Sequence, residues 1–221
     1  MSVRPSDGRP TSIDTVLDAS PLMAVVVIAD AKGASELARA LVRGGVVSIE
    51  VTLRTPAALE AIRRIAGEVP EALVGAGTVL TPKDLHASAE AGARFAVSPG
   101  ATSALLDAGR DGPIPYLPAV ATASEIMEGL ALGYSAFKAF PAAVIGGPAA
   151  LKAFAGPFAD VRFCPTGGIT VATAADYLAL PNVACVGGSW LTPAEALKAG
   201  DWATVERLAR EAMAVLSGRA A

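Results

Sequence analysis

Short apolar runs rich in β-branched residues recur eight times along the chain. They occupy residues 22–28, 46–51, 72–75, 94–97, 114–117, 136–138, 161–164 and 183–186. The spacing between successive runs leaves room for one strand and one crossover helix. The longest uninterrupted apolar stretch, residues 22–29, is far shorter than a membrane-spanning helix and suits a buried parallel strand. The pattern therefore predicts eight strands.

Helix-like stretches between the runs give an alternating order of strand and helix throughout. They include residues 34–43, 57–66, 82–91, 124–131 and 170–180. Gly44-Gly45, Gly92 and Gly133 stand where a helix must stop before the next strand, as C-cap glycines do. Thr81-Pro82 and Thr192-Pro193 carry the opposite signal, an N-cap residue followed by proline at the first helical position.

Eight such units close naturally into a (β/α)8 barrel of the TIM type, which is the α/β fold we expect. A helix over residues 12–18 would precede the barrel, and an amphipathic helix over residues 202–216 would follow the last strand. An open, doubly wound sheet is the alternative, because periodicity alone cannot show closure. We expect residues 1–10 to be a flexible N-terminus and residues 11–221 to form a single domain.

Composition and charge narrow the possible functions. The chain is 52% hydrophobic and 18% charged, with a formal net charge of -3. Binding to nucleic-acid phosphates needs a dense Lys/Arg surface that is missing here, so a small-molecule substrate is expected. The polar first ten residues show no secretory signal, which predicts a cytoplasmic protein. His86 is the single histidine and cannot form a histidine-rich metal site. Cys164 and Cys185 lie in apolar runs and are expected to be reduced core thiols.

Lys138 is the strongest candidate for chemistry. A barrel carries its reacting groups at the C-terminal ends of its strands, and Lys138 ends the sixth run, between Phe137 and Ala139. Burial disfavours a charged ammonium group, so more of the neutral amine would be available to attack a carbonyl carbon. The alternative is a lysine whose amine extends out of the barrel into water.

Glu50 ends the second run and would also direct its side chain toward the barrel mouth. Even-numbered strands of a barrel contribute to the same interior layer, so Glu50 and Lys138 could face one another. A carboxylate near the amine could transfer the protons that carbinolamine formation, dehydration and C–C cleavage require. The alternative role for Glu50 is a structural ion pair with Lys138 or Arg54.

Two glycine pairs, Gly167-Gly168 and Gly187-Gly188, follow the seventh and eighth runs, and Thr166 and Ser189 lie next to them. Many barrels bind phosphate at this place through backbone N–H groups and a helix N-terminus. Tight turns explain either pair alone, but both pairs together favour a phosphate site. The segment Gly75-Ala76-Gly77 is a weaker signal, since Leu80 stands where a dinucleotide fingerprint needs its third glycine.

Six sequence blocks, in order, carry a resemblance to a known family. They are Gly44-Gly45 through Ile49-Glu50-Val51-Thr52-Leu53-Arg54-Thr55, Val74-Gly75-Ala76-Gly77-Thr78-Val79-Leu80, Ala96-Val97-Ser98-Pro99-Gly100, Phe137-Lys138-Ala139-Phe140-Pro141-Ala142, Arg162-Phe163-Cys164-Pro165-Thr166-Gly167-Gly168-Ile169 and Gly187-Gly188-Ser189-Trp190-Leu191. The chain resembles the 2-keto-3-deoxy-6-phosphogluconate (KDPG) aldolases, a family that also includes 4-hydroxy-2-oxoglutarate (KHG) aldolases. The resemblance runs over nearly the whole chain, from about residue 22 to residue 212.

The resemblance implies a class I aldolase that reversibly cleaves KDPG to pyruvate and glyceraldehyde 3-phosphate, without a metal or other cofactor, as a homotrimer. It implies that Lys138 forms the Schiff base and that Glu50 is the general acid/base. It also assigns substrate-binding positions: Arg54, Thr78, Pro99 and Phe140 around the pyruvate part, and Thr166, Gly167, Gly168, Gly188 and Ser189 around the distal end and its phosphate.

Departures from the family pattern fall in supporting positions, at Ala24, Ala119, Ala139 and Ala143. None removes a reacting group, but together they leave substrate selection open. The family alternatives are cleavage of KHG or of the galactonate epimer of KDPG. From a different class, the chain could be a non-catalytic barrel that senses phosphosugars, although such binding would need neither Lys138 nor Glu50.

Overall fold

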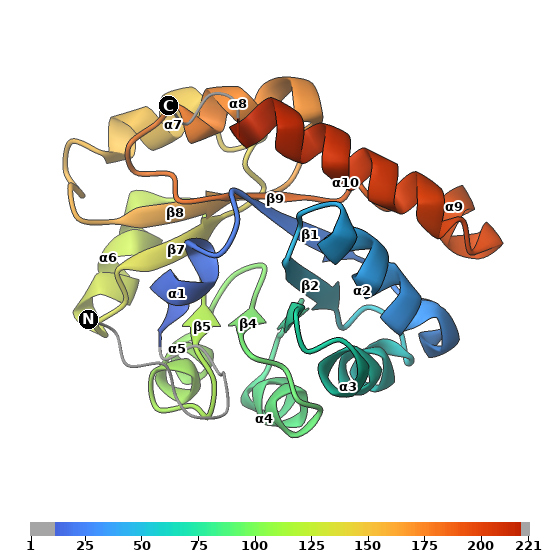
Figure 1. The fold of residues 1–221 in the computed structure, drawn as a ribbon. Coiled ribbons are helices and arrows are strands. Elements are labelled where there is room, and N and C mark those ends of the chain that lie inside the picture. Colours follow the sequence, from blue (N-terminus) through green and yellow to red (C-terminus); the bar gives the residue numbers. More distant parts are fainter. Residues whose placement is uncertain (1–11, 218–221) are drawn as a thin grey trace.

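The computed structural model describes residues 12–217, and within this range the strands form two parallel sheets (Figure 1). The six-stranded sheet is curled and has the order β5-β4-β3-β2-β1-β9, and the three-stranded sheet has the order β6-β7-β8. The strands are β1 Leu22–Val26, β2 Ser48–Thr52, β3 Leu73–Gly77, β4 Ala96–Val97, β5 Tyr116–Leu117, β6 Ala119–Val120, β7 Ala136–Ala139, β8 Arg162–Pro165 and β9 Val186–Gly188.

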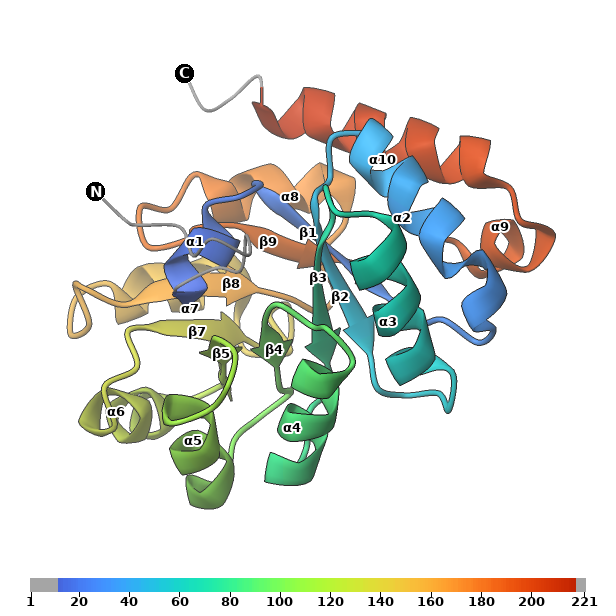
Figure 2. The same ribbon diagram turned by 60° about the horizontal axis from the view of Figure 1, so that its bottom comes forward.

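Helices alternate with the strands and cover the convex side of the curled sheet (Figures 1 and 2). They are α1 Ile13–Leu17, α2 Ala34–Arg43, α3 Ala58–Glu68, α4 Pro82–Glu90, α5 Ser103–Arg110, α6 Ala123–Ala131, α7 Gly147–Phe154, α8 Val171–Leu178, α9 Ala194–Ala199 and α10 Trp202–Ser217, with a 3-10 turn, η1, at Ala31–Gly33. Among the helices of residues 12–217, none has both the length and the apolar character needed to cross a membrane.

The expectation of one closed sheet of eight strands differs from the strand pairing. The fifth predicted run contains β5, but the chain then pairs again as β6, in the other sheet. Pro118 separates the two, because proline has no N–H group for the ladder. Its carbonyl oxygen still accepts a hydrogen bond from the Lys138 N–H, at 2.9 Å. On the other side, the isolated bridges Phe163↔Val183 and Thr166↔Gly187 connect β8 with the chain at β9.

Most of the predicted turn chemistry is confirmed. Gly45, Gly92 and Gly133 have φ angles of 92°, 91° and 88°, the left-handed conformation that glycine adopts most easily. Thr81 caps α4 in a capping box with Asp84. The prediction at Thr192-Pro193 was wrong by one position, because α9 begins after Pro193 and the Thr192 hydroxyl instead donates to the Ser189 carbonyl oxygen. The expected flexible start, residues 1–10, lies outside the described residues.

Helix α1 closes the end of the molecule at which the strands begin (Figure 2). Its buried residues Val16 and Leu17 pack in a cluster with side chains from the strands and from the segment before β9: Met23, Phe95, Val97, Leu117, Ala136, Cys164 and Cys185. Arg162, at the start of β8, donates hydrogen bonds to Asp14 of α1 and to Asp18, the C-cap residue of α1, and the bond to Asp18 is the main cause that raises the pKa of Arg162. Both cysteines are free and buried, as expected.

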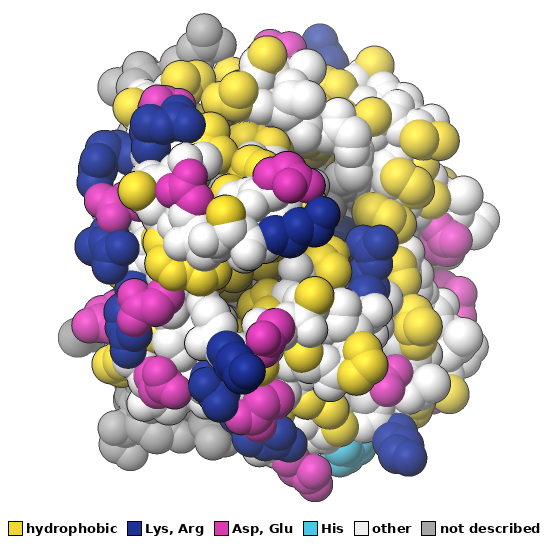
Figure 3. All heavy atoms as spheres, turned by 90° about the vertical axis from the view of Figure 1, so that its right-hand side faces the viewer, with side chains coloured by type: hydrophobic (Ala, Val, Ile, Leu, Met, Phe, Trp, Pro, Cys, Tyr) yellow, Lys and Arg dark blue, Asp and Glu magenta, His cyan; other side chains and the backbone are white. Residues whose placement is uncertain are grey.

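The opposite end, where the strands finish, is open to the surface. We call it the carboxyl edge, and Figure 3 views the molecule from this side. Hydrophobic side chains line a hollow in this face, with basic and acidic side chains beside it. Because parallel strands all end here, polar residues that follow different strands come together at the carboxyl edge.

Candidate active site

Lys138 and Glu50 form a buried ion pair near the carboxyl edge. The Lys138 Nζ donates to the Glu50 Oε1 at 3.0 Å and to Oε2 at 3.2 Å. Their side chains are 6% and 1% exposed. The chain has five lysines, and the other four, Lys32, Lys83, Lys152 and Lys198, are exposed. Lys138 is therefore held inside the protein by a specific partner, and the alternative of an amine that extends into water is wrong.

The strand register explains how these two residues meet. Glu50 is the middle residue of β2, between Val25 of β1 and Gly75 of β3. Lys138 is the third residue of β7, between Ala119 of β6 and Cys164 of β8. The neighbours on both sides are apolar, so neither charged group has a nearer polar partner on the adjacent strands. Each therefore finds its counterpart across the interior.

A buried pair of this kind is well suited to proton transfer. Moving one proton from the Lys138 amine to the Glu50 carboxylate produces a neutral amine beside a neutral carboxylic acid. Burial penalises separated charges, which reduces the cost of forming the neutral state. The neutral amine is the nucleophile required for attack on a carbonyl carbon, and the carboxylic acid can return the proton. The ion pair foreseen as a structural alternative for Glu50 is present, and its geometry also suits catalysis.

Phe140 provides an aromatic wall beside the amine. The Lys138 Nζ lies 5.3 Å from the centroid of the Phe140 ring. A cation over an aromatic face at this distance is stabilised by about 0.5 to 2 kcal/mol. Phe140 follows β7 directly, and its peptide bond to Pro141 is cis. The Phe140 ring is therefore close to the Lys138 amine both in the sequence and in space.

Arg54, Thr78 and Pro99 follow three adjacent strands, β2, β3 and β4, at the carboxyl edge. Arg54 is exposed, and Thr78 and Pro99 are half-buried. Within residues 12–217, none of the three forms a hydrogen bond or ion pair with Lys138 or Glu50. Thr78 has a φ angle of 58°, which is a strained conformation for a β-branched residue. Strain of this kind is found at ligand-binding sites.

The second group of expected site residues lies in the turns after β8 and at the end of β9. Gly167 and Gly168 both have positive φ angles, 100° and 75°. The carbonyl oxygens of Thr166 and Gly167 accept hydrogen bonds from the N–H groups of Ala142 and Ala143, at 2.8 and 3.0 Å. These bonds attach the turn after β8 to the loop after Phe140. The turn that carries the expected phosphate-site residues is therefore held directly against the loop that follows Lys138 and Phe140.

Thr166 carries a buried hydroxyl group without a partner. The residue is 6% exposed, and its Oγ1 makes no hydrogen bond to any described residue. A buried polar atom in this state is costly unless a ligand or water satisfies it. Thr166 pairs with Gly187, where an added Cβ would lie 2.2 Å from this hydroxyl. Gly187 belongs to one of the two glycine pairs that favour a phosphate site in the sequence, and its missing side chain makes room for Thr166.

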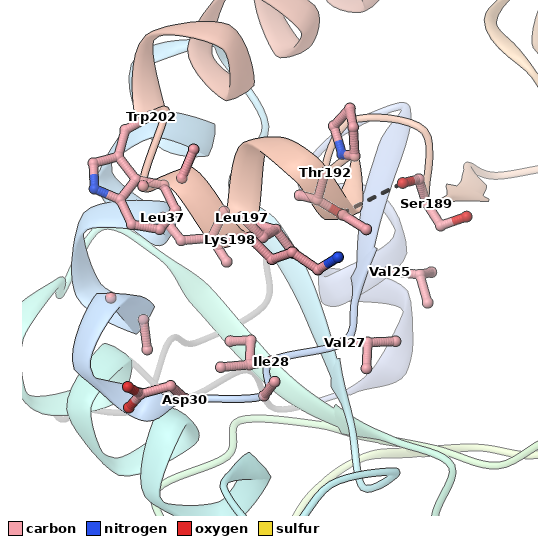
Figure 4. A pocket seen from close by; sticks show the side chains of 17 residues that line it. Val25, Val27, Ile28, Asp30, Leu37, Ser189, Thr192, Leu197, Lys198 and Trp202 are labelled. Carbon is pink, nitrogen blue, oxygen red and sulfur yellow. Dashed lines mark hydrogen bonds between the residues drawn. The ribbon is translucent and has the colours of Figure 1, made fainter.

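An open groove of about 910 Å³ extends from Ser189 (Figure 4). It lies between the end of β1 and helices α9 and α10, with Ser189 at one end and Trp202 at the other. Val25, Ile28 and Leu37 make its wall largely apolar. Lys138 and Glu50 do not line it, so the groove is not the pocket of the ion pair. No pattern in the sequence predicts this groove, because its wall combines segments far apart in the chain.

Among residues 12–217, no three side chains of His, Cys, Asp or Glu gather as potential metal ligands. The polar centre of the site is the Lys138 amine and the Glu50 carboxylate. An amine and a carboxylate buried together near the carboxyl edge of parallel strands are the groups that imine chemistry on a carbonyl substrate requires. The family model for KDPG and KHG aldolases matches residues 13–208, and the chain belongs to this family.

Known relatives cover almost the whole chain. A KHG/KDPG aldolase of Escherichia coli is 55% identical over 203 residues, which are 92% of this chain and 95% of the relative. A 2-dehydro-3-deoxy-phosphogluconate aldolase of Pseudomonas aeruginosa is 52% identical over 201 residues, 91% of each chain.

Solved structures of relatives agree with this family. The KDPG aldolase of Legionella pneumophila, with pyruvate captured as a covalent carbinolamine intermediate, has a TM-score of 0.90 and 50% identity, covering 92% of this chain and 98% of its own. The Zymomonas mobilis enzyme with 3-phosphoglycerate has a TM-score of 0.86 and 51% identity, covering 92% and 95%.

Proposed function

We propose that this protein is a class I aldolase that reversibly cleaves KDPG to pyruvate and glyceraldehyde 3-phosphate, with Lys138 as the nucleophile and Glu50 as the general acid/base. The observation that carries the proposal is the buried pair in which the Lys138 Nζ lies 3.0 and 3.2 Å from the Glu50 carboxylate oxygens. Pyruvate held as a carbinolamine in the Legionella relative supports the same chemistry here.

In the proposed reaction, the neutral Lys138 amine attacks the C2 carbonyl carbon and forms a carbinolamine. Glu50 donates a proton to the departing hydroxyl group, which leaves as water and gives a protonated imine. Glu50, through a water molecule, then removes the C4 hydroxyl proton. The C3–C4 bond breaks, its electrons pass to the imine nitrogen, and glyceraldehyde 3-phosphate leaves. Glu50 returns a proton to C3 of the enamine, and hydrolysis of the imine releases pyruvate and the amine.

The remaining residues divide between the two ends of the substrate. We assign Arg54, Thr78, Pro99 and Phe140 to the pyruvate end. Arg54 is exposed and can form a bidentate pair with the substrate carboxylate. Thr166, Gly167, Gly168, Gly188 and Ser189 are assigned to the distal end and its phosphate. The phosphorylated three-carbon acid in the Zymomonas relative supports a phosphate site in this family.

KHG is the second candidate substrate, because the Escherichia coli relative at 55% identity is named for both KHG and KDPG. KHG keeps the pyruvate half of KDPG and lacks the phosphate, so Lys138 and Glu50 would act on it in the same way. A solved structure named as native KDPGal is only 28% identical, so the galactonate epimer is the weaker candidate.

We also propose a complete fold, an oligomeric state and a cellular location for this protein. The two sheets, with the bridges from β8 to β9, fit a (β/α)8 barrel that is interrupted at Pro118, with α1 as the extra N-terminal helix. We propose one aldolase domain that acts as a homotrimer in the cytoplasm, as the family resemblance implies. Analytical ultracentrifugation would test the trimer directly, and a monomer or dimer would contradict it.

Borohydride reduction in the presence of pyruvate tests the central proposal. The expected result is a reduced pyruvate adduct on Lys138, located by peptide mass spectrometry. Lys152→Arg is the matched control, because Lys152 is an exposed lysine on α7 and its loss should leave labelling unchanged. An adduct on Lys152 or Lys83, or no adduct at all, would contradict the proposal and favour a phosphosugar-binding role without catalysis.

A further inference from the structure

Strand β3 contains two glycines, Gly75 and Gly77, that the backbone conformation does not require. Neither has a φ angle in the left-handed region, so an ordinary L-residue could adopt the backbone of both positions. Glycine inside a strand also lowers stability, because it gives up packing and chain entropy. The reason for glycine at each position must therefore lie in the atoms that surround it.

At Gly77 the surrounding group is the Glu50 side chain. A Cβ added to Gly77 would lie 2.1 Å from the Glu50 Oε1, 2.5 Å from Cγ and 2.6 Å from Cδ, and these are its three nearest atoms. All three distances are far below van der Waals contact, so a methyl group and the carboxylate cannot occupy their positions together. The Glu50 side chain therefore fills the space left by the missing side chain of Gly77.

The carboxylate has little freedom to move aside. Glu50 is 1% exposed, and both of its oxygens accept hydrogen bonds from Lys138. Gly75, two positions earlier in β3, gives a contrast, because a Cβ there would lie 2.5 Å from carbons of the Phe95 ring. Gly75 thus makes room for the apolar core, whereas Gly77 makes room for an ionised group of the active site.

We propose that Gly77 is a positioning residue that holds the Glu50 carboxylate against the Lys138 amine. The inference rests on the proposed role of Glu50 as general acid/base. With a methyl group at position 77, the carboxylate is displaced from the amine, while the Lys138 backbone and its strand neighbours are untouched. Imine formation with pyruvate should then become slower but still reach its equilibrium yield, and the proton transfers at carbon should slow.

The test separates these two steps in Gly77→Ala. The end-point yield of borohydride trapping after long incubation with pyruvate measures how much imine Lys138 holds at equilibrium, whatever the rate at which the imine forms. Exchange of the pyruvate methyl protons in D2O, followed by NMR, measures proton transfer at C3 of the enamine. We expect trapping to remain near the wild-type level, while the exchange rate and kcat fall by roughly 10-fold to 100-fold, the scale of losing a positioned acid/base. The KM for the sugar acid should change much less than kcat.

Two glycine variants serve as controls. Gly67→Ala lies in helix α3, where an added Cβ meets no atom within 4 Å, and it should leave both measurements unchanged. Gly75→Ala places the same methyl group in the same strand but against Phe95. It should lower the unfolding temperature without a selective loss of exchange. A selective loss in Gly75→Ala equal to that in Gly77→Ala would overturn the proposal.

Glu50→Asp provides a rescue test, because its carboxylate is shorter by one methylene group and withdraws from the methyl at position 77. The cost of Glu50→Asp should be smaller in the Gly77→Ala background than in the wild type, since both changes act through one carboxylate. If Gly77→Ala alone does not fold, the double variant should recover folding and trapping. Additive losses, or no recovery, would overturn the proposal.

The measurements distinguish a wrong role for Gly77 from a wrong role for Glu50 and from a wrong aldolase mechanism. A wild-type protein that traps no pyruvate contradicts the aldolase mechanism itself. A Glu50→Gln variant with normal exchange contradicts the role of Glu50. The role of Gly77 is contradicted when Glu50→Gln slows exchange but a folded Gly77→Ala exchanges within twofold of wild type. It is also contradicted when a folded Gly77→Ala loses trapping as well as exchange.

Discussion

Glu50 and Lys138 are 88 positions apart in the chain, yet the lysine Nζ donates to both oxygens of the glutamate carboxylate, at 3.0 and 3.2 Å. The two strands that carry them belong to different sheets. The contact joins the two sheets across the interior, next to the open carboxyl edge. Its disruption should therefore affect both chemistry and stability, and the two effects can be measured separately.

Glu50→Gln should reduce kcat for KDPG cleavage by roughly 100-fold, because an amide cannot transfer the protons that the reaction requires. Pyruvate should still be trapped on Lys138 by borohydride. Steady-state kinetics and peptide mass spectrometry measure the two effects. A kcat close to the wild-type value would show that Glu50 is no general acid/base. Removing one partner of a buried ion pair typically costs about 3 to 5 kcal/mol, so complete unfolding would instead indicate a mainly structural pair.

Ser189→Ala should distinguish the phosphorylated substrate from KHG. A hydroxyl group that donates to a phosphate oxygen contributes about 1.5 to 3 kcal/mol. The kcat/KM for KDPG should therefore fall by roughly 10-fold to 150-fold. Cleavage of KHG should change much less, because it carries no phosphate. Both substrates are assayed with one enzyme preparation, so a folding defect would lower both activities. Equal losses would mean that Ser189 only supports its turn.

Thr78→Gly should lower activity without lowering stability. The φ angle of 58° at Thr78 strains the backbone by about 1 to 3 kcal/mol, and glycine removes this strain. The unfolding free energy should stay equal or rise, while kcat/KM falls because the side chain at the pyruvate end is lost. Thr78→Ala is the matched control, since it removes the hydroxyl and keeps the strain. Chemical denaturation and kinetics measure both effects, and a less stable Thr78→Gly would contradict the expectation.

The tyrosines should make stability fall at alkaline pH. The chain has three tyrosines, and burial raises the pKa of Tyr116, to about 12, and the pKa values of Tyr134 and Tyr177. A hydrogen bond of 2.6 Å joins the Tyr116 and Ser98 hydroxyl groups, which partly offsets the shift. Because the folded pKa values exceed the unfolded value of about 10, the resulting stability is present below pH 10 and is lost as the pH rises toward 12.

Tyrosinate absorbance at 295 nm should show this shift directly. The native protein should ionise its tyrosines at higher pH than the protein in guanidinium, and the unfolding free energy should decrease above pH 10. Tyr177→Phe should remove part of the delayed absorbance change without disturbing the Ser98 hydroxyl group. Coinciding titration curves for the native and unfolded protein would contradict the burial of these side chains.

The local elements follow from sequence because their causes are local. Apolar runs fixed the positions of the strands to within a few residues, and Gly45, Gly92 and Gly133 have the positive φ angles expected of helix ends. Thr81 and Pro82 begin α4 as their types suggest. The apolar runs do not predict the split of the fifth strand at Pro118, although a proline indicates that strand pairing breaks there. Its effect depends on which neighbour each half pairs with, which the local sequence does not specify.

The sequence alone was enough to predict the family, the two apolar runs that carry Lys138 and Glu50, and the residue types that the proposed chemistry needs. The hydrogen-bonded pairing of these two side chains is seen only in the fold, because their contact depends on strand register and sheet curvature across 88 positions. The tertiary structure alone revealed the groove beside Ser189 and the reason for glycine at position 77, where a methyl group would lie 2.1 Å from the Glu50 carboxylate. The room beside a residue depends on how distant segments pack against it. The neighbours of that residue in the sequence do not specify which atoms will fill this room.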